Sequence, residues 1–97
     1  MNISIDRQKL EKLCRKYKIR KLSIFGSALR SDFSPDSDVD VLVEFENGCN
    51  PGLSFFTIQE ELSKILGRNV DLNTRGFISP AILENVLKES VVQYVAP

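Results

Sequence analysis

The fold is decided by residues 22–43, which read LSIFGSALRSDFSPDSDVDVLV. This stretch opens with a short apolar run, Leu22 to Phe25, which Gly26 ends, and that pattern predicts a buried strand. It closes with Val39 to Val43, where β-branched residues predict a second strand. Residues 31–37 between them are rich in Ser, Asp and Pro and predict a loop. Two strands therefore flank a turn that carries polar and acidic side chains.

Outside this stretch, the spacing of apolar residues alternates between the periods of helices and strands. The predicted elements are helices over Asp6–Tyr17, Ser54–Leu66 and Pro80–Lys88, a loop over Glu46–Gly52 and a short strand over Val70–Leu72. Gly67 is expected to end the second helix, and Ser79 to cap the third. For Val91–Val95 the pattern leaves a last strand and a helical tail open. The order predicts an α+β fold in which a small sheet is flanked by helices, in a single domain over residues 1–97.

Composition excludes several classes of protein. The 97 residues include no His and only two Cys, so a His-based serine or cysteine triad is excluded and a structural zinc site lacks ligands. No apolar run is long enough to span a membrane, and the charged N-terminal segment does not resemble a signal peptide. We therefore expect a cytoplasmic protein without membrane contact, with Cys14 in the core, Cys49 in a loop and no disulfide between them.

The acidic block at residues 31–50 is the most informative charge feature, because it holds six acids and no basic residue. Alternate residues of a strand project from the same face, so Asp38 and Asp40 are expected to point together. Two carboxylates held close repel each other unless a cation compensates them. Magnesium prefers such oxygen ligands and leaves its other positions to water and substrate phosphates. The pattern therefore predicts a magnesium site, although a solvated acidic turn is the simpler interpretation of these two residues alone.

Phosphate-binding groups precede the two acids. Gly26 lets the backbone approach a ligand closely, and Ser27 supplies a hydroxyl group and a backbone donor. If Ser27 opens a short helix, its free N–H groups form a phosphate site, and Arg30 adds a positive charge on the same face. Alternatively, Arg30 pairs with a nearby Asp on the surface.

A third acid, Asp71, lies between apolar residues in the predicted strand Val70–Leu72, where an unpaired charge would be costly. If this strand neighbours Val39–Val43, Asp71 joins the other two acids, as a third metal ligand or as the base for an attacking hydroxyl. Glu44 shares a strand face with Asp40 but lies farther along, and we expect it at a solvated end.

The run from Phe25-Gly26-Ser27 through Arg30 to Asp38-Val39-Asp40 resembles the signature of the minimal nucleotidyltransferases, small relatives of DNA polymerase beta. Residues 66–72 resemble the segment that carries the third acid in this family, so the resemblance covers nearly the whole chain. Ser31 departs from the family, which commonly has glycine there.

The resemblance implies a polymerase beta-like nucleotidyltransferase fold with a mixed sheet, and two magnesium ions at Asp38, Asp40 and Asp71. It also implies phosphate contacts from Gly26 and Ser27, and transfer of AMP from ATP to a hydroxyl group. Small members of this kind are commonly antitoxins that pair with, and in some cases adenylylate, a HEPN-domain toxin. Those that modify aminoglycosides carry a further domain, so we do not expect a small-molecule acceptor.

Two functions remain open. The first is a magnesium-dependent adenylyltransferase that acts on a partner HEPN toxin. The second is an antitoxin that keeps the fold but neutralises its partner by binding alone. The basic residues of the first helix alternate with an apolar stripe and the formal net charge is zero, so we expect no direct nucleic-acid binding. The acceptor, the base preference and a homo-oligomeric state are left open.

Overall fold

The structure is a computed structural model that describes residues 3–29 and 36–97. In chain order its elements are α1 (Arg7–Lys16), β1 (Ile19–Phe25), the 3₁₀ helix η1 (Gly26–Leu29), β2 (Val39–Phe45), α2 (Ser54–Leu66), β3 (Val70–Asn73), the 3₁₀ helix η2 (Arg75–Phe77), α3 (Pro80–Glu89) and β4 (Val91–Val95). The predicted order of helices and strands is confirmed.

Local sequence signals account for the helix ends. Asp6 caps α1, because its Oδ1 atom accepts hydrogen bonds from the backbone N–H groups of Gln8 and Lys9. Gly67 ends α2 in the left-handed conformation, with φ of 66°, as predicted. Ser79 caps α3 through a hydrogen bond from the N–H group of Ala81.

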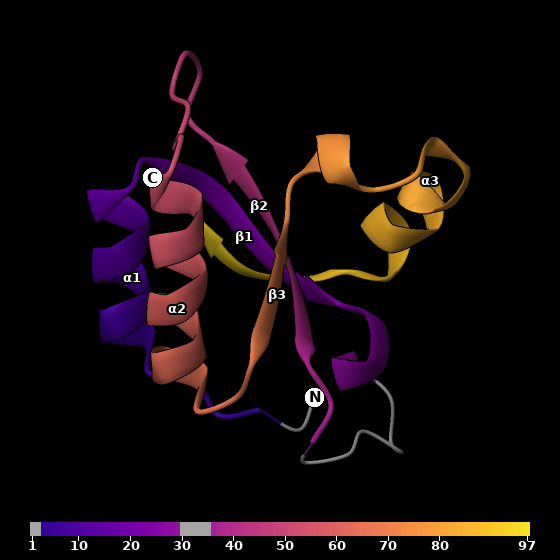
Figure 1. Ribbon diagram of the computed structural model, residues 1–97, viewed down its shortest axis with the longest axis horizontal. Coiled ribbons are helices and arrows are strands. Elements are labelled where there is room, and N and C mark those ends of the chain that lie inside the picture. The colour runs from indigo at the N-terminus through magenta and orange to yellow at the C-terminus, as the bar shows by residue number, and fades with distance from the viewer. Residues whose placement is uncertain (1–2, 30–35) are drawn as a thin grey trace.

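The four strands form one mixed sheet in the order β3-β2-β1-β4 (Figure 1). β1 pairs antiparallel with both β2 and β4, whereas β2 and β3 are parallel and joined through α2. The segment left open in the sequence, Val91–Val95, is therefore a strand. β1 also begins three residues earlier than expected, at Ile19. The strand extends beyond the apolar run because Ile19 pairs with Phe45 and Lys21 pairs with Glu44 on β2.

The sheet has a different cover on each face (Figure 1). On one face, β-strand side chains pack against α1 and α2 in the main core, which includes Leu22, Ile24, Val39, Val41, Val43, Val70 and Leu72. On the other face, Leu42 packs with Ile78 and Val86 in a smaller cluster supplied by α3 and the segment before it. Because α3 covers only part of this second face, polar residues of β2 and β3 remain accessible there.

Both cysteines are free thiols, with Cys14 buried in the main core and Cys49 half-buried after β2, as predicted. Within the two described ranges, no helix has the length and apolar character needed to cross a bilayer.

Candidate active site

The strand register brings two of the predicted acids side by side. Asp40 on β2 pairs directly with Asp71 on β3 in the parallel ladder. Their neighbours Val39, Val41 and Val70 belong to the main core, so alternation turns both carboxylates toward the α3 side of the sheet. β3 thus neighbours β2. The sequence predicted that Asp71 would join Asp40 if these two strands were neighbours.

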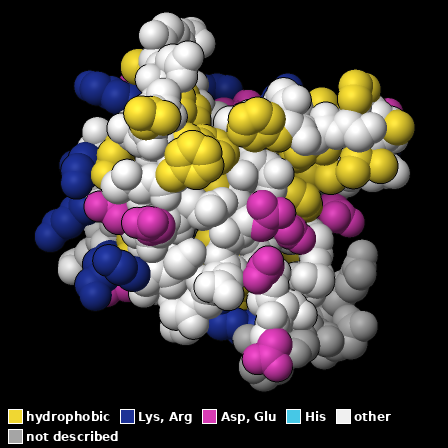
Figure 2. Space-filling model, in the orientation of Figure 1, with side chains coloured by type: hydrophobic (Ala, Val, Ile, Leu, Met, Phe, Trp, Pro, Cys, Tyr) yellow, Lys and Arg dark blue, Asp and Glu magenta, His cyan; other side chains and the backbone are white. Residues whose placement is uncertain are grey.

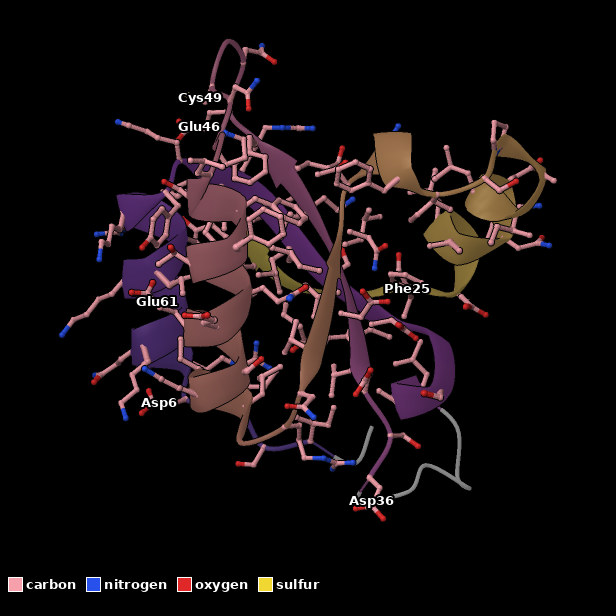
Figure 3. The ribbon with its side chains drawn as sticks, viewed as in Figure 1. Asp6, Phe25, Asp36, Glu46, Cys49 and Glu61 are labelled. Carbon is pink, nitrogen blue, oxygen red and sulfur yellow. The ribbon has the colours of Figure 1, made fainter. Side chains whose placement is uncertain are left out.

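Gly26 closes the other side of Asp40. Phe25, the last residue of β1, pairs with Asp40 and lies on the α3 side of the sheet (Figure 3). Gly26 follows with φ of 75°, and a Cβ atom on it would overlap the Oδ2 atom of Asp40. Glycine is therefore required here both by the backbone conformation and by the closeness of the carboxylate.

The environment of Asp40 disfavours its charged form. Burial raises the pKa of the Asp40 carboxyl group above its usual range, and the charges of Asp71, Asp38 and Glu89 raise it further, together with a hydrogen bond to Asp71. A nearby cation would reverse this effect, because it would stabilise the charged carboxylate.

The remaining predicted residues differ in how they are placed. Asp38 lies exposed just before β2 and is near enough for its charge to act on Asp40. Ser27 is half-buried in η1, which begins at Gly26 rather than at Ser27 as the sequence suggested. Arg30 lies outside the described residues.

Glu89 is a site residue that sequence reasoning missed. It is the last residue of α3, and its Oε1 atom accepts a hydrogen bond of 3.3 Å from the Gly26 N–H group. Its charge also acts on Asp40. The sequence offered one indirect signal for Glu89, the strand-like segment Val91–Val95. Glu89 reaches the site because this segment pairs with β1.

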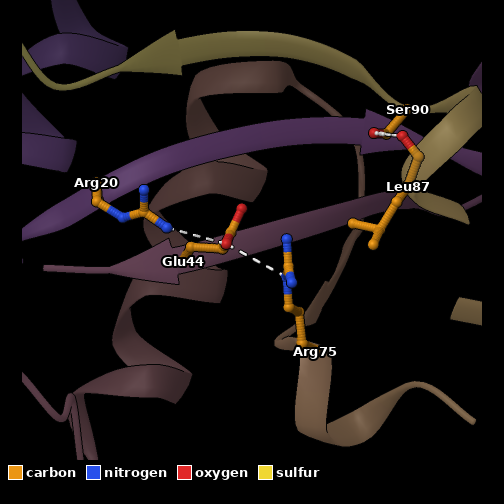
Figure 4. Close-up of polar contacts among 5 residues, drawn as sticks. All are labelled: Arg20, Glu44, Arg75, Leu87 and Ser90. Carbon is orange, nitrogen blue, oxygen red and sulfur yellow. Dashed lines mark hydrogen bonds and ion pairs between the residues drawn. The ribbon is translucent and has the colours of Figure 1, made fainter. Parts of the chain in front are cut away.

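The expectation for Glu44 was wrong. Its side chain is only 14% exposed, and Oε1 forms ion pairs with Arg20 at 3.1 Å and Arg75 at 3.3 Å (Figure 4). The position is not a solvated end, because the arginine of η2 folds back over β2. Glu44 therefore ties η2 to the sheet.

The acids fit an open magnesium site better than a closed one. Among residues 3–29 and 36–97, no three His, Cys, Asp or Glu side chains form a ready-made set of metal ligands. Asp40 and Asp71 nevertheless offer adjacent hard oxygen donors whose crowding raises the Asp40 pKa. Magnesium commonly takes only one or two carboxylates from a protein and completes its shell with water and phosphate oxygens. The residues present thus suit that ion.

The surface around the site is open. A hollow of about 480 Å³ adjoins Asp38 and lies along α2, where Gln59 and Lys64 line it, whereas the Asp40 and Asp71 carboxylates face the α3 side of the sheet. On the face shown in Figure 2, hydrophobic side chains gather near the acidic ones. Phe56 and Phe77 are 63% and 69% exposed, and each makes an edge-to-face contact with Phe55. Phe56 and Phe77 therefore lie at the surface.

Comparisons with known proteins found a matching family model and similar curated proteins. The family model described as nucleotidyltransferase domain matches residues 6–92. The protein adenylyltransferase MntA of Thermococcus cleftensis is 36% identical over 81 residues, which cover 84% of this chain and 81% of that protein.

Two solved structures share the fold at low sequence identity. A toxin-antitoxin complex with AMP-PNP superposes with a TM-score of 0.72 at 20% identity, over 95% of this chain and 75% of that chain. A tri-AMPylated HEPN toxin of Shewanella oneidensis in complex with its MNT antitoxin gives a TM-score of 0.63 at 21% identity, over 93% and 70% of the two chains.

Proposed function

Because the chain belongs to the nucleotidyltransferase domain family, we propose that it transfers AMP from ATP to a hydroxyl group of a partner toxin and thereby acts as its antitoxin. The chain is a nucleotidyltransferase, and the relative MntA is a protein adenylyltransferase. The observation that carries the proposal is the pairing of Asp40 with Asp71 while Gly26 packs directly against Asp40. This arrangement supports the proposal, because two acids that could hold a metal ion lie beside a backbone turn that could receive phosphate.

In this proposal Asp38, Asp40 and Asp71 hold magnesium, in two ions as in other two-metal sites. The ions would neutralise the triphosphate and stabilise both the attacking and the leaving oxygen. Asp71 serves as the third ligand or as the base that takes the proton of the acceptor hydroxyl. Its place on the strand next to Asp40 is compatible with either role.

Gly26 and Ser27 orient the triphosphate, since a glycine with positive φ lets the chain turn against the site. We assign Arg30 an additional contact to phosphate, because it carries a positive charge three residues after Ser27 in the sequence. The acceptor oxygen attacks the α-phosphorus of ATP and forms a new P–O bond. The bond between the α-phosphorus and the oxygen that bridges it to the β-phosphate breaks, and pyrophosphate leaves. The proton of the acceptor passes to a carboxylate of the site or to water.

The acceptor comes from outside this chain. Asp38 and Asp71 are exposed and Asp40 is half-buried, so the acids face open solvent, which favours a macromolecule that presents its hydroxyl group over a small molecule that needs enclosure. The structural neighbour that contains an AMPylated HEPN toxin suggests a toxin of that class as the partner. ATP as the donor and two free thiols favour the cytoplasm.

The test is a transfer assay with the product of the neighbouring gene as the candidate acceptor. Wild-type protein, magnesium and ATP labelled at the α-phosphate should label the partner, whereas ATP labelled at the γ-phosphate should not. Asp38→Asn with Asp40→Asn should abolish the label. The matched control, Glu46→Gln with Glu84→Gln, removes two exposed charges elsewhere and should leave transfer unchanged.

The same assay separates the two functions that the sequence left open. If no label moves and the Asp38→Asn, Asp40→Asn variant still neutralises the partner fully, the enzymatic proposal is wrong and the chain acts by binding alone.

A further inference from the structure

The ladder between β1 and β4 brings the end of α3 to the active site. Ile24 pairs with Val91, and Ser23 with Val92, so the antiparallel register continues outward to place Glu89 opposite Gly26. The α3 helix ends at Glu89, and a hydrogen bond from the Ser90 hydroxyl group to the Leu87 carbonyl oxygen closes its last turn (Figure 4). The position of Glu89 is therefore fixed by the sheet rather than by a loose loop.

One continuous row of contacts crosses this end of the sheet. Glu89 accepts from the Gly26 N–H group, Gly26 packs against Asp40, and Asp40 pairs with Asp71. Each strand or its neighbouring element supplies one member. A displacement of Gly26 would accordingly change the space beside Asp40.

Glu89 occupies this position against two unfavourable electrostatic effects. An acid in the last turn of a helix faces the negative end of the helix dipole, and the Asp40 carboxylate repels it. Its 3.3 Å hydrogen bond from the Gly26 N–H group offsets these effects in part, and solvent screens both of them because Glu89 is exposed. An acid at a position that these local preferences disfavour is expected more often at a functional site.

We infer that Glu89 is a positioning residue, which holds the Gly26–Ser27 turn against Asp40 by accepting the Gly26 N–H hydrogen bond. The inference rests on the proposed function, because it concerns how the turn orients the triphosphate. In the alternative role of a gate, Glu89 would occupy the Gly26 N–H group that could otherwise bind phosphate. A gate would weaken nucleotide binding, whereas a positioning contact supports turnover.

Kinetics of AMP transfer distinguish these roles. Glu89→Ala should lower kcat about tenfold, the equivalent of one charge-assisted hydrogen bond, while KM for ATP changes by less than about twofold. Glu89→Gln keeps an oxygen that can accept from Gly26 and should recover most of the loss. Glu84→Ala is the matched control, because Glu84 lies on the same helix, is likewise exposed and forms an ion pair with Lys88 instead of a contact with Gly26. A lower KM in Glu89→Ala would show a gate, and unchanged kcat would overturn the inference.

Amide hydrogen exchange provides a readout that does not need activity. In ¹⁵N-labelled protein, the Gly26 amide should exchange about tenfold faster in Glu89→Ala than in Glu84→Ala, and at nearly the wild-type rate in Glu89→Gln. Equal exchange in the two alanine variants would overturn the inference even if transfer occurs. Absence of transfer by wild-type protein would instead overturn the proposed function.

Discussion

At the scale of single residues, Gly26 brings the backbone directly against the carboxylate of Asp40. We predict that Gly26→Ala costs about 1–3 kcal/mol of stability, because alanine is strained at positive φ. It should also abolish AMP transfer, because the new methyl group overlaps Oδ2 of Asp40. Urea denaturation and the transfer assay measure the two effects.

Gly48 provides the matched control for this variant. It has a similar φ of 79°, but no atom lies within 4 Å of a Cβ atom added there. Gly48→Ala should therefore share the backbone strain and keep full transfer activity. Equal loss of activity in both variants would show that strain rather than the contact with Asp40 is responsible.

The ionised Asp40 carboxylate is expected to lower the stability of the metal-free protein. Its pKa is raised in the folded protein, so the ionised carboxylate opposes folding, and this cost is absent below about pH 4, where the group is protonated in both states. As pH rises through the raised pKa, the metal-free wild type should lose stability. Asp40→Asn removes the charge and should melt a few degrees higher near neutral pH in EDTA, with the difference closing toward acid pH. A variant that melts below wild type throughout would contradict this prediction.

Individual site residues differed in how far the sequence could predict them. The alternation around Asp40 and the apolar neighbours of Asp71 correctly indicated which face each carboxylate takes, because a strand's side-chain period is local information. Glu89 carried no such signal, since its place depends on a pairing between segments far apart in the chain. The roles of these residues stay predictions.

At the scale of elements, helix ends were the most predictable feature. Gly67 ends α2 as expected, because a glycine cap acts over a few residues, and α2 begins at Ser54 as expected although no side chain caps it. β4 was not predictable as a strand, since Val91–Val95 offers a short apolar run that suits either structure. The hydrogen-bonding partner that decides the matter, β1, lies at the other end of the sequence.

The ion-pair cluster of Glu44, Arg20 and Arg75 determines how firmly η2 is held. We predict that Glu44→Ala costs about 1 kcal/mol in urea unfolding, a small value because both arginine side chains are about half exposed and screened by solvent. The loss should shrink at high salt. Glu84→Ala, which removes a largely exposed pair with Lys88, should change stability less. An equal loss in the two variants would mean that Glu44 contributes no more than a surface charge.

At the scale of the whole molecule, Cys14 reports on opening of the core. Burial raises the pKa of its thiol to about 12, so at pH 8 it is both protonated and inaccessible. We predict that iodoacetamide modifies Cys49 in the native protein, and Cys14 only when urea unfolds the chain. Peptide mapping by mass spectrometry follows each thiol separately. Modification of both at the same rate without urea would show that α1 detaches from the sheet under native conditions.

The α+β class and the single sheet followed from the order of periodic segments, but the strand order β3-β2-β1-β4 did not. Apolar patterns identify which side chains are buried and carry no information about which strand lies beside which. Val39 and Leu22, for example, have the pattern of any buried strand residue, although their strands occupy the centre of the sheet.

The central place of β1 also has a kinetic consequence. Of the three strand pairings, the one between Ile24 and Val91 closes the longest stretch of intervening chain. Long closures are slow to form, because the entropy of the loop is lost before the new contacts compensate for it. Refolding from urea should therefore pass through molecules in which the helices have already docked and β4 has not yet paired with β1.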